Sequence, residues 1–364
     1  MKAYFILLSL SFCFIGQLFS QEKSQAEQLQ QILDQDFVDG QFAGVVAAYA
    51  IGDQQVIVAA GQQDLEAQIP FETQSLNRIA SIAKSMTAVA VLQLYEQGLI
   101  ELDEPIASYL PNYPQRDANR ISVRHLLQHS SGIGAYKSAK ETESKKEFSS
   151  LSDAAAIFQD RDLVDEPGNA EHYTTYGYVV LGMIIEVVSG QTYEEYMQAN
   201  IWDKADMKNT GVEHWGTAYE NKSKLYHKKK RGRIRLADPN NLSNRVPGGG
   251  LYSTAEDLLK FGQAVLTDRL ISESTFALMM ENPGLPHEGN PYGMGWFLYG
   301  ENPELGPVYG HTGGQTGCSS VLLIMPEKEA VIIVMSNTSR TLDHVFGIAI
   351  LHIFPILKAY KAED

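Results

Sequence analysis

The sequence predicts an α/β (α+β) fold in which an antiparallel sheet is flanked by helices and a mainly helical lobe is inserted. Two observations lead to this fold class. Apolar, Val-rich runs typical of strands lie near both ends of the chain, whereas the middle carries helical periodicity. This order favours a discontinuous α/β lobe with helices inserted between its two halves. The cleft between the lobes is the expected place for a binding site.

The N-terminal strands are expected at residues 44–50 and 55–60, where Gly52 and Asp53 separate two apolar runs as in a β-hairpin. Residues 21–35 before them are polar and Gln-rich, and we expect a short helix or a tether there. Residues 78–97 after them are typical of a helix that is apolar almost all round and therefore buried. Gly98 is a natural end for that helix.

The middle of the chain is predicted from its capping signals. Each expected helix has a polar residue at its start or a glycine at its end. The signals are Ser122 for a helix to residue 127, Ser152 for 153–159, Gly190 closing 178–189, Thr192 with Glu195, and Ser253 with Asp257 for a helix to residue 265.

The C-terminal part returns to strand character. Residues 321–325 and 330–335 are apolar runs joined by 326–329, which indicates a second hairpin. An apolar helix over 342–354 follows, and Pro355 should end or kink it. We therefore expect an N-terminal tether or helix at 21–39, a main domain at 40–340, and a C-terminal helix and tail at 341–364. Within the domain, the α/β lobe takes about 40–80 and 292–360, and the helical lobe about 81–291.

The first twenty residues are expected to be a signal peptide. Lys2 precedes an apolar stretch at 3–16, and residues 18–21 form an imperfect cleavage site. The protein is then exported, either periplasmic or secreted. An uncleaved signal anchor is the alternative. Removal of the leader leaves Cys318 as the remaining cysteine, which excludes an intramolecular disulfide.

Composition limits the partners. The 364 residues carry a formal net charge of −15, which argues against nucleic acid or an anionic membrane as the main partner. No later run of about 20 apolar residues occurs, so no stable membrane span is expected after cleavage. The basic stretch at 222–235 allows an anion or cell-wall polymer site, but a solvated hairpin turning at Arg231 and Gly232 is the favoured interpretation.

Ser81 and Lys84 are the most informative pair in the chain. On a helix, residues three apart lie on one face, roughly 5–6 Å apart at Cβ. A serine hydroxyl is a poor nucleophile until a base takes its proton, and a desolvated lysine amine can do so. The pattern is short, however, and Ser20 with Lys23 repeats it by chance. The pair therefore needs partners before it indicates chemistry.

Three later segments supply candidate partners. They are the stretch from His125 to Gly132, the tyrosine-rich stretch at 173–178, and the His-Thr-Gly-Gly run at 311–314 just before a strand. In this order the chain resembles the serine β-lactamase and penicillin-binding-protein superfamily, in its class C-like branch. The Pro-Gly-Gly-Gly run at 247–250 also resembles that family. Thr175 and the 311–314 run look most like the LACTB-type subgroup.

The resemblance implies a role for each matching residue. Ser81 would be the acylated nucleophile and Lys84 its base. Tyr173 would relay protons, which demands a phenol pKa well below its usual value of about 10. His311 would donate to substrate where many relatives carry a lysine. The backbone N–H groups of Ser81 and Gly314 would form the oxyanion hole.

The remaining matches concern substrate binding. Thr312, Gly313 and Thr175 would line the substrate site, and glycines allow a substrate backbone to approach the strand edge. Thr175 stands where strong β-lactamases usually carry asparagine. A hydroxyl lacks the paired donor and acceptor of an amide, which favours peptide or ester substrates over β-lactams.

Several other residues have simpler interpretations. His129 is expected to brace its own loop, His125 to pack a helix, and Tyr176 and Tyr178 to lie in the core. The nine histidines show no metal-ligand spacing, so we expect neither a metal nor a cofactor.

Three functional hypotheses follow. The first is an exported serine hydrolase acting through an acyl-enzyme on Ser81, as a peptidase, carboxypeptidase or esterase on a small-molecule, peptide or ester substrate. The alternatives are a weak class C-like β-lactamase and a non-catalytic binding or sensor protein that kept the fold. A homo-oligomeric scaffold is compatible with either activity or its absence.

Overall fold

A computed structural model describes residues 23–114 and 117–361. The expected signal peptide lies outside this range. Within it, seven strands form the main sheet in the order β3-β2-β1-β12-β11-β10-β9. Their bounds are β1 Gly44–Ile51, β2 Gln54–Asp64, β3 Ile69–Pro70, β9 Phe297–Asn302, β10 Gly306–Gln315, β11 Cys318–Met325 and β12 Ala330–Ser336. The sheet is antiparallel throughout, so the predicted fold class is confirmed.

Two small sheets flank the main one. The first has the order β4-β8-β5 and the second β13-β6-β7. Their strands are β4 Asn77–Arg78, β8 Leu251–Ser253, β5 Gly211–Val212, β13 Thr338–Ser339, β6 Tyr226–Lys228 and β7 Ile234–Leu236. The β6–β7 pair is the basic hairpin expected from the sequence, with Arg231 and Gly232 at positive φ in its turn.

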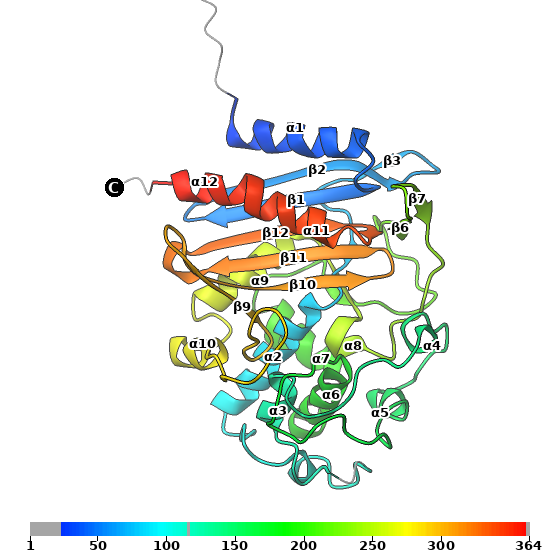
Figure 1. Cartoon of the computed structure of the whole chain (residues 1–364), viewed down its shortest axis with the longest axis vertical. Helices are drawn as coiled ribbons and strands as arrows, with labels where there is room; N and C mark the ends of the chain where they lie inside the picture. The colour runs from blue at the N-terminus through cyan, green and yellow to red at the C-terminus, as the bar shows by residue number, and fades with distance from the viewer. Residues whose placement is uncertain (1–22, 115–116, 362–364) are drawn as a thin grey trace, which may run out of the picture.

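Helices cover both faces of the main sheet and build the second lobe (Figure 1). The α-helices are α1 Gln25–Val38, α2 Ile82–Glu96, α3 Val123–Leu127, α4 Ala139–Thr142, α5 Leu151–Ala155, α6 Tyr176–Ser189, α7 Tyr193–Met197, α8 Val246–Gly249, α9 Ala255–Leu266, α10 Glu273–Met279, α11 Leu342–Ile348 and α12 Phe354–Ala359. Short 3-10 helices are η1 Ile106–Ser108 and η3 Pro326–Lys328, and π-helical turns are η2 Gln198–Trp202 and η4 Ala349–Ile353.

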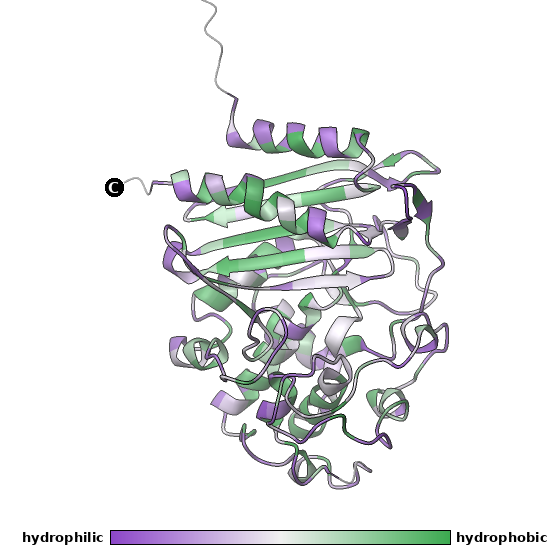
Figure 2. Cartoon of the chain, in the orientation of Figure 1, coloured by the Kyte–Doolittle hydropathy of each residue, from purple (hydrophilic) through white to green (hydrophobic). Residues whose placement is uncertain are grey.

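The central strands are buried on both faces, and Figure 2 shows them in hydrophobic green. Along β12, Ile333 and its alternate neighbours pack with α2, α6 and α9. Ile332 and its alternate neighbours face the opposite way, toward α1 and α11. This period-2 alternation lets one strand serve two cores. Helix α9 thus covers the sheet, although its residues fall in the range expected for the helical lobe.

Four helix starts differ from the sequence prediction, and one of them is α6, which begins at Tyr176 rather than at 178. Helix α2 begins at Ile82 rather than at 78, because Arg78 pairs with Tyr252 in β4–β8 and Ala80 turns the chain at φ +48°. Ser150, not Ser152, caps α5, and Thr254, not Ser253, caps α9. In both helices the observed cap accepts the N3 backbone N–H, which places the cap two residues before the expected one in α5 and one residue after it in α9.

The C-terminal helix also differs. Helices α11 and α12 run on through Pro355, because the wider π turn η4 comes directly before it and relieves the clash that a proline ring makes one turn back. The segment Leu342–Ala359 is long and apolar enough to cross a membrane, with a mean hydropathy of 1.5. This contrasts with the expected absence of such a segment after the leader. One face of it packs on the sheet through Val345, Ile348 and Leu357.

Candidate active site

Ser81 lies at the start of α2, and the segment before it is held in place by the sheet. The Cys318 thiol donates to Arg78 O at 3.0 Å, and the Ser320 hydroxyl donates to Ile79 O at 3.0 Å. Ala80 then adopts a left-handed φ of +48°, a conformation that is strained for a residue with a Cβ. These anchors place the Ser81 hydroxyl at the junction of the sheet and the helical lobe.

Lys84 follows one turn later and is fully buried. Its Nζ lies 3.0 Å from Ser81 Oγ, 3.2 Å from Thr175 Oγ1 and 2.8 Å from Gly248 O. No carboxylate pairs with Lys84 among the described residues. Burial, and secondarily the positive charge of Arg245, hold the Lys84 pKa well below its ordinary value. The amine is thereby favoured in its neutral, basic form.

Two segments close around the lysine. Thr175 precedes α6, and the Pro-Gly-Gly-Gly run forms α8, which packs against both α2 and α6. A Cβ on Gly248 would lie 2.6 Å from Thr175 Cγ2. Position 248 must therefore be glycine, because a side chain there would push α8 away from Thr175 and move the Gly248 carbonyl away from the Lys84 amine.

Tyr173 lies beside the same pair. Lys84 Nζ is 4.9 Å from the centre of its ring, and the Tyr173 hydroxyl is near enough to Ser81 for the serine to affect its pKa. The tyrosine is 37% exposed, yet burial of its hydroxyl raises the pKa above the ordinary value, and the Ser81 contact opposes this only in part. The expected low phenol pKa is therefore wrong for the free site, because burial of the hydroxyl outweighs the contact with Ser81.

His311 lies within strand β10 rather than just before a strand, and it is fully buried. Its Nδ1 is 2.6 Å from Thr312 O, so Nδ1 carries the proton. Its Nε2 therefore accepts from the Tyr292 hydroxyl at 3.0 Å. Burial, with a contribution from Lys84, lowers the His311 pKa to about 3. Both ring nitrogens are thus occupied, and the expected donation from His311 to substrate does not fit this arrangement.

The glycines after His311 do different things. A Cβ on Gly313 would lie 2.2 Å from Ser320 Oγ and 2.5 Å from Ile79 O, so this glycine lets β10 pass close to the segment before Ser81. A Cβ on Gly314 would meet nothing within 4 Å, and the residue is exposed. Of these two glycines, only Gly314 therefore has open space beside the strand edge. Thr312 is half-buried and lies close to the Tyr299 hydroxyl.

Two buried arginines near Ser81 were not expected from the sequence. Arg78 makes a bidentate ion pair with Glu213 at 2.7 and 2.9 Å, which anchors the chain just before Ser81. Arg245 donates to Asn244 Oδ1 and to the carbonyl oxygens of Glu141 and Thr142. Its position two residues before the Pro-Gly-Gly-Gly run was the available signal.

The other histidines and tyrosines near the site have structural roles. His129 holds the loop of Tyr173, since its Nδ1 accepts from Thr174 N at 3.3 Å and its ring centre lies 4.2 Å from that of Tyr173. His125 completes a capping box with Ser122. Tyr176 and Tyr178 are fully buried. No cluster of three or more metal-ligating side chains occurs in the described part of the chain.

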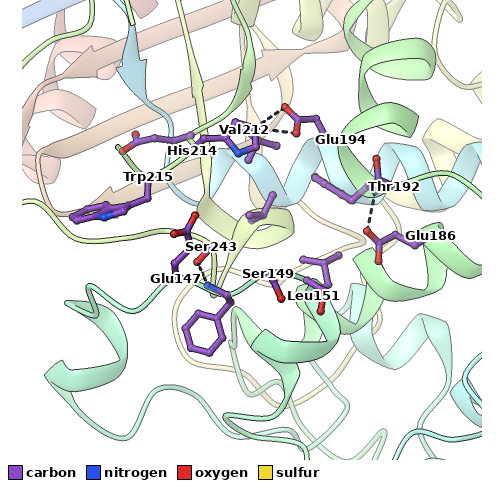
Figure 3. Close-up of a pocket in the computed structure, with 15 residues that line it drawn as sticks. Glu147, Ser149, Leu151, Glu186, Thr192, Glu194, Val212, His214, Trp215 and Ser243 are labelled. Carbon is purple, nitrogen blue, oxygen red and sulfur yellow. Dashed lines mark hydrogen bonds and ion pairs between the residues drawn. The ribbon is translucent and has the colours of Figure 1, made fainter. Parts of the chain in front are cut away.

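Two cavities flank the site. One of about 680 Å³ is lined by Tyr173, Phe297 and Glu171, and burial raises the Glu171 pKa to about 7. The other, of about 710 Å³, reaches Gly314. A third, of about 340 Å³, appears in Figure 3. Its Glu194 pairs with His214 and its Glu213 with Arg78, and none of its lining residues hydrogen-bonds Ser81 or Lys84.

Comparison with known proteins identifies relatives along most of the chain. It is 28% identical to penicillin-binding protein 4* of Bacillus subtilis, covering 89% of this chain and 74% of that protein. It is 27% identical to human mitochondrial serine beta-lactamase-like protein LACTB, with 78% and 69% covered. It is 25% identical to the teichoic acid D-alanine hydrolase of Staphylococcus aureus, with 84% and 74% covered.

Solved structures with similar folds include proteins of the same kind. The D-amino acid amidase of Ochrobactrum anthropi superposes with a TM-score of 0.80 at 26% identity, covering 92% of this chain and 99% of that one. An octameric penicillin-binding protein homologue from Pyrococcus abyssi gives 0.78 at 25% identity, covering 91% and 78%. A profile of the Beta-lactamase family matches residues 27–351, and the chain belongs to that family.

Proposed function

We propose that this protein is a serine hydrolase that cleaves acyl–amide or acyl–ester bonds through an acyl-enzyme on Ser81. One observation carries the proposal: a fully buried lysine without a carboxylate partner lies 3.0 Å from the hydroxyl of Ser81. A neutral amine at hydrogen-bond distance is the arrangement that activates a serine. Family membership supports it, because the relatives include an amidase and a D-alanine hydrolase.

In the proposed mechanism, Lys84 takes the proton of Ser81 while Oγ attacks the acyl carbon. The backbone N–H groups of Ser81 and Gly314 receive the oxyanion. The lysine is then an ammonium beside the Tyr173 ring, whose π face stabilises a cation at 4.9 Å. The phenol passes a proton from Lys84 to the leaving group. Because it accepts one proton as it gives another, this relay requires no phenolate in the free enzyme.

We propose D-alanyl amides and esters, or short peptides, as the substrate class. Thr175 Oγ1 accepts from Lys84 at 3.2 Å, and a hydroxyl lacks the paired donor and acceptor with which an asparagine would bind a β-lactam side-chain amide. The names of the amidase and of the D-alanine hydrolase point the same way. Weak β-lactam hydrolysis is the second candidate, and the same assay detects it.

The test is covalent labelling followed by turnover. We expect intact-mass spectrometry to show one adduct with a fluorophosphonate, and Ser81→Ala to abolish it. Ser85→Ala is the matched control, since Ser85 lies on the same helix and donates to Gly295 O rather than to Lys84. Kinetics should compare D-alanyl esters and amides, their L counterparts and nitrocefin. A protein that forms no adduct with any acylating probe would end the proposal.

We also propose that the protein is exported, on the strength of the leader pattern at residues 1–20. Expression of the full chain should yield a mature N-terminus near Gln21, found by N-terminal sequencing of the secreted or periplasmic fraction. Recovery of the intact leader in a membrane fraction would favour the anchor instead.

A further inference from the structure

The β6–β7 hairpin concentrates positive charge that the proposed chemistry does not use. In a chain of net charge −15, residues 228–235 contain lysine or arginine at all positions but two and no acidic residue. Lys228 donates to Gln41. No carboxylate pairs with the others in the part of the chain that the structure describes, and all are exposed: Lys229, Lys230, Arg231, Arg233 and Arg235.

The strand register determines where these charges point. Arg235 lies directly opposite His227, so the two side chains are on the same face of the hairpin. Lys229 and Arg233 are two positions farther along and are joined by a backbone hydrogen bond of 2.8 Å, so they continue that face. His227 and Ala237, which are on this face by the same alternation, line the cavity of about 710 Å³. The face therefore opens toward that cavity.

The same cavity reaches the candidate active site. Gly314, with open space at its α-carbon, lines it together with Thr316. Arg340, from the end of β13, and Lys145 add two exposed cations. Glu143 and Asp238 lie there as well, and Glu143 accepts from Thr316 Oγ1 at 2.8 Å. These four charges balance, so the excess of positive charge comes from the hairpin face, which forms a wall beside the cavity next to His227.

The amount of charge indicates the type of ligand. A single carboxylate needs one arginine or lysine partner, whereas this wall offers Lys229, Arg233 and Arg235, with Arg340 in the lining of the adjoining cavity. The arginine fork matches phosphate oxygens in two-point contacts. Unpaired cations crowded on one small hairpin also repel one another, and a ligand with repeated negative charge relieves that repulsion.

We propose that this wall binds a chain of repeated phosphate groups, which brings an acyl ester carried by that chain to Ser81. This inference rests on the proposed function and names its substrate class. Ser81 Oγ forms an ester with the acyl carbon, and the bond from that carbon to the polymer oxygen breaks. The proton that Ser81 lost passes to that polymer oxygen, which leaves as an alcohol. Water then hydrolyses the acyl-enzyme.

Binding is tested without turnover, using the full chain with Ser81→Ala and a fluorescent poly(glycerol phosphate). We expect anisotropy to show binding that weakens as salt rises, because the contacts are exposed and screened. Adding R233Q/R235Q should weaken it on the order of tenfold, since exposed ion pairs are individually weak and two of them are lost. The matched control is K230Q/R231Q, which removes the same charge from the turn of the same hairpin and should have a clearly smaller effect.

Turnover separates this inference from the proposed function. Wild type should hydrolyse the D-alanyl ester of poly(glycerol phosphate) with a higher kcat/KM than the D-alanyl ester of glycerol, and R233Q/R235Q should lose that preference while keeping the glycerol ester activity. No hydrolysis of either ester would defeat the proposed function and leave the binding result to stand. Equal effects of the two double variants, or equal binding of a peptide with one terminal carboxylate, would overturn the phosphate site.

Discussion

At the residue scale, the protonation state of Lys84 decides whether Ser81 can be activated. The lysine is fully buried, and its fixed neighbour Arg245 carries a positive charge that is satisfied by carbonyl and amide oxygens instead of a carboxylate. Burial and this uncompensated charge both disfavour a second cation. Arg245 is thus a positioning residue that acts through Lys84, and His311, neutral and hydrogen-bonded at both nitrogens, adds no competing charge.

Replacing Arg245 should move the pH dependence of hydrolysis. Without the guanidinium, Lys84 holds its proton to a higher pH, so the acid limb of kcat/KM for Arg245→Gln should shift upward. Arg245→Lys keeps the charge and should shift it less. The measurement is a pH–rate profile with a neutral ester, alongside a melting curve for each variant. An acid limb that stays in place in a folded Arg245→Gln protein would contradict this role.

At the element scale, strand β10 has two adjacent glycines with different structural roles. Gly313 passes Ser320 and Ile79 so closely that any side chain would clash, whereas Gly314 faces open space. Gly313 therefore allows the sheet to pack against the segment before Ser81, and Gly314 leaves space for a substrate. The sequence alone shows two equal glycines, and the difference depends on what lies across from each.

Alanine at these two positions should separate folding from activity. Gly313→Ala overpacks a buried contact, and we expect a loss of unfolding free energy of about 1–3 kcal/mol with activity falling as well. Gly314→Ala should leave stability nearly unchanged but reduce kcat/KM, because a methyl group enters the open space beside the strand. Denaturant unfolding and ester kinetics measure the two effects. Equal stability losses in both variants would show that this distinction is wrong.

At the scale of the whole molecule, the sheet is sandwiched between two cores and the site lies where β10 meets the helical lobe. Each central strand contributes alternate side chains to both cores, so displacement of one strand disturbs α1 and α11 on one face and α9 on the other. His129 and His311 lie fully buried at this junction. The fold therefore links its stability to pH through the same residues that surround Lys84.

We expect stability to fall as the pH drops below about 6.5. Burial lowers the pKa of both histidines, and that of His311 falls to about 3. Below pH 6.5 the unfolded chain therefore binds protons that the folded chain does not bind. Each such histidine costs about 1.4 kcal/mol per pH unit below 6.5 until its folded pKa is reached. Chemical denaturation between pH 8 and 4 measures this, and His311→Asn should lessen the slope. Unchanged slopes in a folded variant would argue against a neutral, buried His311.

Oligomeric state also belongs to this scale. An octameric homologue is known, and the apolar C-terminal helix exposes Leu351 on its outer side. Size-exclusion chromatography with light scattering determines the state directly.

Local patterns in the sequence were enough for much of the fold. Continuous apolar runs predicted the hairpins β1–β2 and β11–β12, and glycine after an apolar helix predicted the ends of α2 and α6. Helix starts were less predictable where a strand pair competed, as at Arg78, or where adjacent polar residues both fitted a cap, as at Thr254. Such choices depend on partners distant in the chain.

For the site, the sequence by itself determined which residues are chemically able to act: a serine and a lysine one helical turn apart, with a tyrosine and a glycine-rich strand to follow. Only the tertiary structure decided their charge and orientation. Burial beside Arg245 lowers the pKa of Lys84, while burial raises the pKa of Tyr173 and lowers that of His311, whose ring nitrogens are hydrogen-bonded to Tyr292 and to the Thr312 carbonyl. The reason is that a pKa depends on the solvent and charges surrounding a group, and these come from segments that local sequence does not specify.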